Sequence, residues 1–234
     1  MGVVLEFLYA AALKKRFECY GHFYRWRFGD EVYGCRSVLE VVDVSRVDER
    51  GSALWGRRAD AVVVMMNPGS SRPLGRCEEG EVERFSGGEK ALVLTQPDTT
   101  QYQVMRVAVA CGWSHVRVLN LSDLREAKSA AFLARVEGLA GQRGGGAHSL
   151  FSEGRAEECA VGLRRRVGPV LVGWGQDPRL LPLAAQCVGA LGDVERVGVA
   201  SEWNSLLYAH PSPMLQRMKV AWLGAVVSAL EDVR

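Results

Sequence analysis

The chain has 234 residues, of which 48% are apolar and 24% are charged, as is usual for a folded globular protein. It has 29 lysine and arginine residues against 27 aspartate and glutamate residues. The net charge of +2 therefore excludes a protein that binds nucleic acid through a strongly basic overall field. The length predicts a single domain over 1–234, with 1–60 as an N-terminal extension and 61–234 as the core.

The extension has two parts. Residues 1–15 have an apolar pattern that ends in charges, which predicts an amphipathic helix and neither a signal peptide nor a membrane span. In 17–34, aromatic, charged and small residues alternate, which predicts a β-hairpin that flanks the core. We therefore expect a cytoplasmic protein that does not contact the membrane.

Three later segments, 61–66, 116–121 and 167–175, are short, β-branched and apolar on both faces. Such strands belong to parallel sheets that are covered on both sides. A fourth, more mixed segment at 194–200 suits an edge strand. Helical patterns lie at 99–113 behind Asp98 as N-cap, and at 129–141, 153–166 and 177–192. This order predicts an α/β fold: a three-layer α/β/α sandwich around a central, mainly parallel four-stranded sheet.

The sequence predicts neither a metal nor a cofactor. No two cysteines form a C-x-x-C pair, and no two histidines have metal-ligand spacing. Neither a P-loop nor a Gly-x-Gly-x-x-Gly motif is present. The six cysteines are therefore expected to be reduced thiols: Cys19, Cys35, Cys77, Cys111, Cys159 and Cys187.

Two short motifs attract attention because of their place in the chain. Asn67, Pro68 and Gly69 follow the first core strand, and ligands gather at the carboxyl ends of parallel strands. Near the C-terminus, two prolines bracket Ser212 in a stiff loop that presents His210 at fixed geometry. Taken alone, the first motif is about equally well explained as a plain turn.

Together the two motifs resemble those of the uracil-DNA glycosylase superfamily. Met-Asn-Pro-Gly at 66–69 resembles the first motif of its single-strand-selective and mismatch-specific branches, and His-Pro-Ser-Pro at 210–213 resembles the last motif. Asn120 resembles the strand-end asparagine that reads a flipped base, and 171–175 resembles the strand before the last motif. The resemblance covers 61 to about 219.

The resemblance implies a DNA glycosylase in which Asn67 orients the attacking water and His210 donates a hydrogen bond to the departing base. It implies that Asn120 and Gly69 bind the base. The stacking aromatic remains open between Tyr102, our first choice, and two further candidates, Phe85 and Trp174.

For DNA contacts, the resemblance implies Ser70, Ser212, Met214, Arg217 and Lys219. Met214 would be the wedge that holds the stack open, although a core position in a C-terminal amphipathic helix explains it equally well. We expect the protein to act as a monomer on DNA.

A carboxylate for the reaction is not evident. Gly-Gln-Asp-Pro at 175–178 has the letters of the water-activating motif of the best-known branch, but it follows a different strand. We therefore interpret Asp177 as a helix N-cap and leave open whether Asp177 or Asp98 contributes a carboxylate.

The strictest uracil enzymes carry a tyrosine where this chain has Gly69, and its absence leaves room at pyrimidine C5. The expected substrate is a C5-substituted pyrimidine, such as hydroxymethylcytosine or its glucosylated form, or a uracil-like base. Glycosylases of that superfamily are known to attack such phage bases, so the resemblance implies a role in defence. Two alternatives stay open: an N-glycosidase for free nucleosides or nucleotides, and a module that binds modified bases without cutting.

Overall fold

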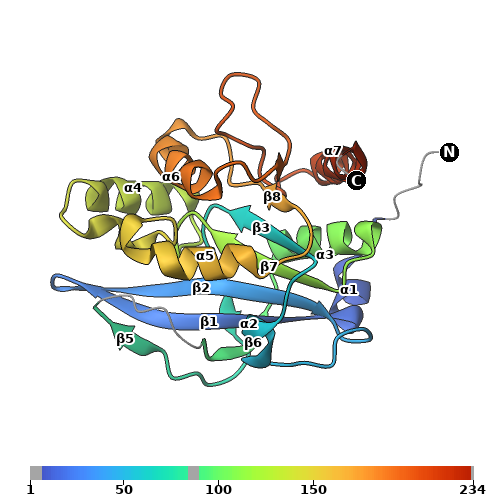
Figure 1. The fold of residues 1–234 in the computed structure, drawn as a ribbon, viewed down its shortest axis with the longest axis horizontal. Coiled ribbons are helices and arrows are strands. Elements are labelled where there is room, and N and C mark those ends of the chain that lie inside the picture. Colours follow the sequence, from blue (N-terminus) through green and yellow to red (C-terminus); the bar gives the residue numbers. More distant parts are fainter. Residues whose placement is uncertain (1–6, 84–89, 233–234) are drawn as a thin grey trace.

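The computed structural model describes residues 7–83 and 90–232 and has a mixed α/β fold. A large sheet runs through the middle, and helices pack on both of its faces (Figure 1). The described strands are β1 (Phe17–Phe28), β2 (Glu31–Asp43), β3 (Ala61–Met65), β4 (Arg72–Pro73), β5 (Gly80–Val82), β6 (Leu92–Gln96), β7 (His115–Asn120), β8 (Val170–Val172) and β9 (Arg196–Val197).

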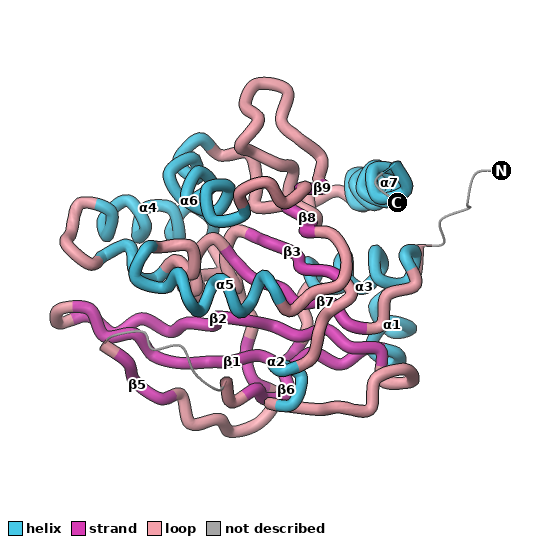
Figure 2. Tube along the Cα trace, in the orientation of Figure 1, coloured by secondary structure: helices cyan, strands magenta, loops and turns pink. Residues whose placement is uncertain are grey.

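The described helices are α1 (Ala10–Arg16), α2 (Ala53–Gly56), α3 (Thr99–Cys111), α4 (Ser129–Ala140), α5 (Ala156–Arg164), α6 (Leu181–Leu191) and α7 (Gln216–Asp232). Short 3-10 helices lie at Gly145–His148, Glu153–Arg155 and Pro178–Leu180. Figure 2 shows the long loop that leads from β9 to α7. In the described part of the chain, no helix is long and apolar enough to cross a membrane.

The four predicted core strands are present, and they pair in parallel with one another. β3 lies between β7 and β8, and β9 pairs with the outer side of β8. They are not a separate sheet, however, because the described sheet has nine strands in the order β4-β6-β1-β2-β7-β3-β8-β9, with β5 beside β1. Most of its pairing is antiparallel, so a mainly parallel four-stranded sheet is not confirmed.

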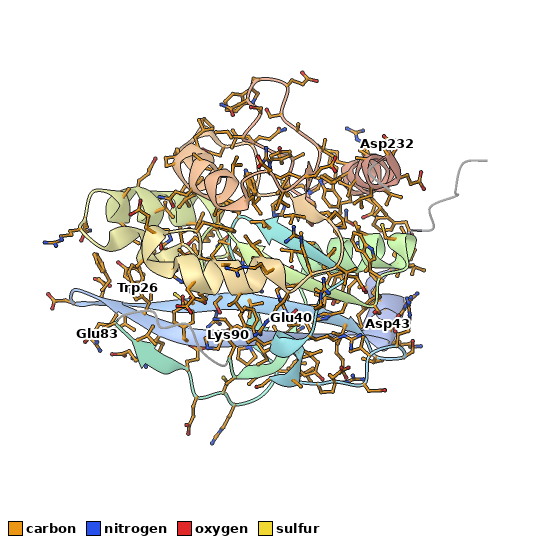
Figure 3. The ribbon with its side chains drawn as sticks, viewed as in Figure 1. Trp26, Glu40, Asp43, Glu83, Lys90 and Asp232 are labelled. Carbon is orange, nitrogen blue, oxygen red and sulfur yellow. The ribbon has the colours of Figure 1, made fainter. Side chains whose placement is uncertain are left out.

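The N-terminal hairpin accounts for the difference between the predicted four-stranded sheet and the observed nine-stranded sheet. The antiparallel pairing of β1 and β2 was predicted, but the hairpin does not flank the core, because β2 also pairs with β7. Glu40 of β2 reinforces this junction (Figure 3). Its carboxylate lies 2.8 Å from His115 Nε2 and accepts from Arg117 Nε at 2.7 Å, and all three side chains are buried. Loss of one partner would leave a buried charge unpaired, at a cost of about 3–5 kcal/mol.

Two apolar clusters fill the space between the sheet and its helices. One face packs against α2, α4, α5 and α6 and contains Trp26, Phe132 and Trp174. The other packs against α1, α3 and α7 and contains Met105 and Trp222. Burial of each such side chain contributes about 1.5–3 kcal/mol. The two clusters hold the sheet rigid, and with it the loops at the strand ends.

The predicted N-caps are confirmed. The Asp98 carboxylate accepts from the backbone N–H groups of Thr100 and Gln101, and the Gln101 side chain accepts from the backbone N–H of Asp98. This reciprocal capping box fixes the start of α3. Asp177 accepts from the backbone N–H of Arg179 and also pairs with its guanidinium.

Candidate active site

Asn67 and Asn120, the two asparagines of the candidate site, lie close together because the strands that precede them are neighbours in the sheet. Met65 of β3 is in register with Asn120 of β7. The pairing continues past the strand ends, since Leu121 and Ser122 donate backbone hydrogen bonds to the carbonyls of Met65 and Met66. Asn67 follows directly and therefore lies at the same edge of the sheet as Asn120, as predicted from the strand-end rule.

The segment with His210 reaches this edge by packing against the end of β8. Tyr208 bridges to Gly175 and to Ala200. A Cβ atom added at Gly173 would lie 3.1 Å from the Pro211 ring, so any other residue here would require the ring to shift slightly.

These three segments line a cavity of about 210 Å³ together with Arg36, the start of α3 and the residues around the start of α4. Its lining includes five residues that were predicted from the sequence: Asn67, Gly69, Ser70, Asn120 and His210. The volume is below the range of about 300–1,000 Å³ that is usual for drug-sized ligands. The cavity therefore suits a single small ring with a few polar edges.

The Asn67 amide has a fixed orientation. Its Nδ2 donates to the backbone carbonyls of Leu124 at 3.1 Å and Glu126 at 2.8 Å. Because an amide nitrogen has two N–H groups, both are used, and Oδ1 is left to accept a hydrogen bond from a ligand or water.

Asn120 is fully buried at the floor of the cavity. In the orientation that satisfies both ends of its amide, Nδ2 donates to the Asn67 backbone carbonyl at 3.3 Å and Oδ1 accepts from Arg36 Nη2 at 3.2 Å. One N–H group and one lone pair of this amide remain for a base. Asn120 thus also connects the first motif to Arg36.

His210 is held in one tautomer. The backbone N–H of Ser212 donates to His210 Nδ1 at 3.2 Å, so in the neutral ring the proton is on Nε2. Burial lowers the pKa of His210 below its usual 6.5, although the Asp98 carboxylate acts in the opposite direction. The imidazole is therefore neutral at pH 7 and can donate from Nε2.

Several predicted residues lie outside the cavity lining. Tyr102 is buried in the apolar cluster beside α7, with the Lys14 ammonium 5.9 Å from its ring centre. Ser212 and Met214 follow His210 in the loop that leads into α7, and Arg217 and Lys219 lie in the first turn of α7. Met214 is 97% exposed, so a core position for this side chain is wrong.

The other candidates are also placed. Trp174 is fully buried and donates from its indole N–H to the Leu206 carbonyl, as expected for a core residue. Phe85 lies outside the described residues. Asp177 pairs with Arg179 and is not part of the cavity lining.

Two charged residues complete the cavity lining, Arg36 and Asp98. A Cβ atom built on Gly69 would lie 3.7 Å from Asp98 Oδ2, so this carboxylate faces the first motif. The sequence offered a signal for Asp98, because it caps the helix that follows the insertion after β3. It offered none for Arg36, which lies within the hairpin.

Comparison of the chain with protein-family models, curated proteins and solved structures gives no significant match. The functional argument therefore depends on the chemistry of the cavity. That chemistry consists of a fixed amide oxygen, a neutral imidazole donor, a carboxylate and a guanidinium around a space for one ring.

Proposed function

We propose that the protein is a DNA glycosylase that takes a modified pyrimidine out of the DNA stack and hydrolyses its N-glycosidic bond. The observation that carries this proposal is the meeting of Asn67, Asn120 and His210 in one cavity, since they come from three distant segments. Each of them also matches a motif of the uracil-DNA glycosylase superfamily. The neighbouring parallel strands β7, β3, β8 and β9 add support, because a parallel four-stranded core is the architecture that we expected together with these motifs.

The reaction needs a nucleophile, a negative charge near the sugar and a hydrogen-bond donor near the departing base. The bond between sugar C1′ and base N1 breaks, its electron pair leaves with the base, and the water oxygen bonds to C1′. One water proton ends on the base and the other remains on the new sugar hydroxyl. Asn67 Oδ1 orients the water, and His210 Nε2 donates to the base as negative charge develops there.

Asp98 supplies the carboxylate that Asn67 lacks in this proposal. It lines the cavity, whereas Asp177 is engaged by Arg179 at an exposed helix start. A negative charge near the sugar stabilises the oxocarbenium character that develops at C1′. Asp98 also keeps its capping bonds to α3, so its position is fixed before a substrate binds.

Gly69 leaves space beside the base, which favours a C5-substituted pyrimidine as substrate. Its φ of +61° is in the left-handed region, so the turn itself also requires glycine. Hydroxymethylcytosine, which phages place in their DNA, fits this description, and in its glucosylated form the sugar ring would extend out of the cavity. A role in defence against such phages follows from that substrate.

The Gly69→Tyr variant should lose activity on DNA with glucosyl-hydroxymethylcytosine at least about tenfold more than on DNA with a small base, because the ring would occupy the substituent's volume. Gly69→Ala is the control, since it adds the backbone strain of the positive φ without the ring. Steady-state rates on both DNAs measure the effect. Equal losses on the two DNAs in the tyrosine variant would contradict the C5 pocket.

The Met214→Ala variant should lose about tenfold or more activity on duplex DNA and little on single strands, because a wedge acts only where a stack must be held open. Met218→Ala is a matched control, since Met218 is 49% exposed and belongs to α7. Single-turnover rates on both forms of one sequence measure this. A similar loss on single strands would argue against a wedge at position 214.

A gel assay for abasic sites tests the proposed function directly. DNA with one modified pyrimidine should be cleaved by alkali after treatment with the protein, and not after treatment with Asn67→Ala. Tight binding of the modified DNA without strand cleavage would instead support a binding module. Release of a base from the free nucleoside but not from DNA would support a nucleosidase.

A further inference from the structure

Trp203 differs from the other tryptophans of the chain in its exposure to solvent. The chain has six tryptophans, and five of them are at most 9% exposed: Trp26, Trp55, Trp113, Trp174 and Trp222. Trp203 is 57% exposed. An aromatic ring stabilises a fold mainly through its burial, so a ring left in water contributes little to this one. The ring of Trp203 is therefore free to contact a ligand.

Trp203 lies at the tip of a hairpin, residues 198–209, that follows β9. Because β9 is parallel to β8 and β8 to β3, the chain that continues from β9 leaves the sheet at its carboxyl edge, where the cavity lies. Figure 2 shows this loop extending beyond the sheet and its helices. The returning arm ends directly before His210, and at about 3.3 Å per residue its last four steps span about 13 Å. A DNA strand with one base in the cavity can therefore reach the tip.

The 198–209 hairpin is held in one conformation. Backbone hydrogen bonds join its two arms. At the tip, Asn204 accepts from the backbone N–H of Leu206 through Oδ1 and from the backbone N–H of Leu207 through its carbonyl. The buried Trp174 donates from its indole N–H to the Leu206 carbonyl at 3.0 Å, which ties the hairpin to the core. Trp203 is thus presented at a fixed place, so little freedom is lost when a ligand binds to it.

The residues around Trp203 restrict the kind of ligand that it can contact. Residues 198–209 contain one acidic side chain, Glu202, and neither lysine nor arginine, so the hairpin does not attract a phosphate. The neighbours of Trp203 at the tip are Glu202, Asn204 and Ser205, all of them polar. The centre of a protein interface is instead a continuous apolar patch that is poor in charge. One exposed ring among polar residues suits a single flat partner, such as a nucleobase.

We propose that Trp203 is a stacking platform for an unpaired base of the DNA strand that places its modified base in the cavity, and that it directs the protein to single-stranded DNA. The inference rests on the proposed function for the identity of the ligand. Trp203 is not part of the cavity lining, so it contacts a neighbouring base and not the one that is released. In a duplex the neighbouring bases are paired and stacked on one another, and they offer no free face to the ring. A single strand does.

The first test measures equilibrium binding of DNA without a modified base, so that nothing can be cleaved. The probe is a short single-stranded oligothymidylate with a fluorescent label, followed by anisotropy. Trp203→Ala should weaken its binding about tenfold, as for the loss of one base stack, and Trp203→Phe should retain most of the affinity. Neither change should alter the dependence of affinity on salt, because no phosphate contact is lost. Unchanged affinity in Trp203→Ala would overturn the inference.

Three controls show whether the effect is stacking on a base. Tyr9→Ala removes another exposed aromatic ring, 74% exposed before the first turn of α1, and should bind the probe like the natural chain. A strand of the same length whose sugars carry no bases keeps the phosphates, so the natural chain and Trp203→Ala should bind it alike. The duplex form of the probe should also bind both proteins alike. A tenfold loss on the base-free strand or on the duplex would contradict stacking.

Tryptophan fluorescence gives a second and more direct signal. Since the other five tryptophans are buried, a base that stacks on Trp203 should quench the emission of the natural chain and not that of Trp203→Phe. Quenching by the oligothymidylate that persists in Trp203→Phe would overturn the inference, even if the protein releases bases from modified DNA. Quenching that requires Trp203 supports it even if no base is released from any DNA, which would be a failure of the proposed function alone.

Stability and kinetics separate this role from a structural one. Trp203→Ala should leave the thermal midpoint of unfolding unchanged, because the ring is exposed. On a single strand with a modified base it should raise KM about tenfold and leave kcat unchanged, since the ring contacts no reacting atom. A lower thermal midpoint together with a lower kcat would show that the ring supports the segment before His210, and would contradict a role in binding DNA.

Discussion

Base release by the Asn67→Ala variant should fall to the detection limit, a loss on the order of a hundredfold or more, while DNA affinity changes little. The reason is that Asn67 Oδ1 orients the attacking water, and this interaction stabilises the transition state but not the bound DNA. The amide is held by Leu124 and Glu126 whether or not DNA is bound. Rates under single-turnover conditions and equilibrium binding of the same DNA measure the two quantities separately.

Asn67→Asp provides an informative companion to the alanine variant. One carboxylate oxygen would replace Nδ2 and face the carbonyls of Leu124 and Glu126, which now accept at 3.1 and 2.8 Å. Three acceptors in contact repel one another, so this variant should be less stable and should not gain activity. An Asn67→Ala protein with unchanged turnover would contradict the role assigned to this residue.

His210→Ala should slow base release by about a hundredfold, as for the loss of one donor to a developing anion. Because burial lowers the pKa of His210, the neutral ring that donates from Nε2 persists below the usual value of 6.5. The natural chain should therefore keep its rate as the pH falls to 6.5, and lose it only further down, when protonation of Nδ1 breaks the bond from Ser212. A pH-rate profile checks this.

The alanine variant supplies the control for that profile. Its residual rate should not show the acid limb that His210 causes in the natural chain. A loss of less than about threefold on removal of the imidazole would move the leaving-group role to another residue. Arg36 is the nearest alternative, because it lines the same cavity.

The helices and parallel strands could be predicted from the sequence because their patterns are local. β3, β7 and β8 follow from short apolar runs, and α3 follows from its capping residue Asp98. The place of the hairpin could not be predicted, since alternation in β1 does not show which strand will pair with β2. The buried Glu40 contacts that join β2 to β7 are long-range and have no local signal.

The residues of the candidate site can likewise be divided into those with a local sequence signal and those without one. Asn67 and His210 could be found because a strand end and a rigid proline loop restrict where side chains go, and Asn120 was found through its resemblance to a superfamily motif. Arg36 could not, because a one-residue bulge reverses the face on which it lies. Tyr102 was our first choice for the stacking aromatic that the resemblance implies, but the helical turn of α3 directs it into the apolar cluster beside α7.

The most direct test of the account is mass spectrometry of the small molecules released from DNA. Single-stranded and duplex DNAs would carry 5-hydroxymethylcytosine, its glucosylated form, uracil or no modification. We predict a free C5-substituted pyrimidine base, in an amount equal to the abasic sites formed, with the natural chain and not with Asn67→Ala. If no free base appears from any of these DNAs while the folded protein binds them, the account of a glycosylase is wrong.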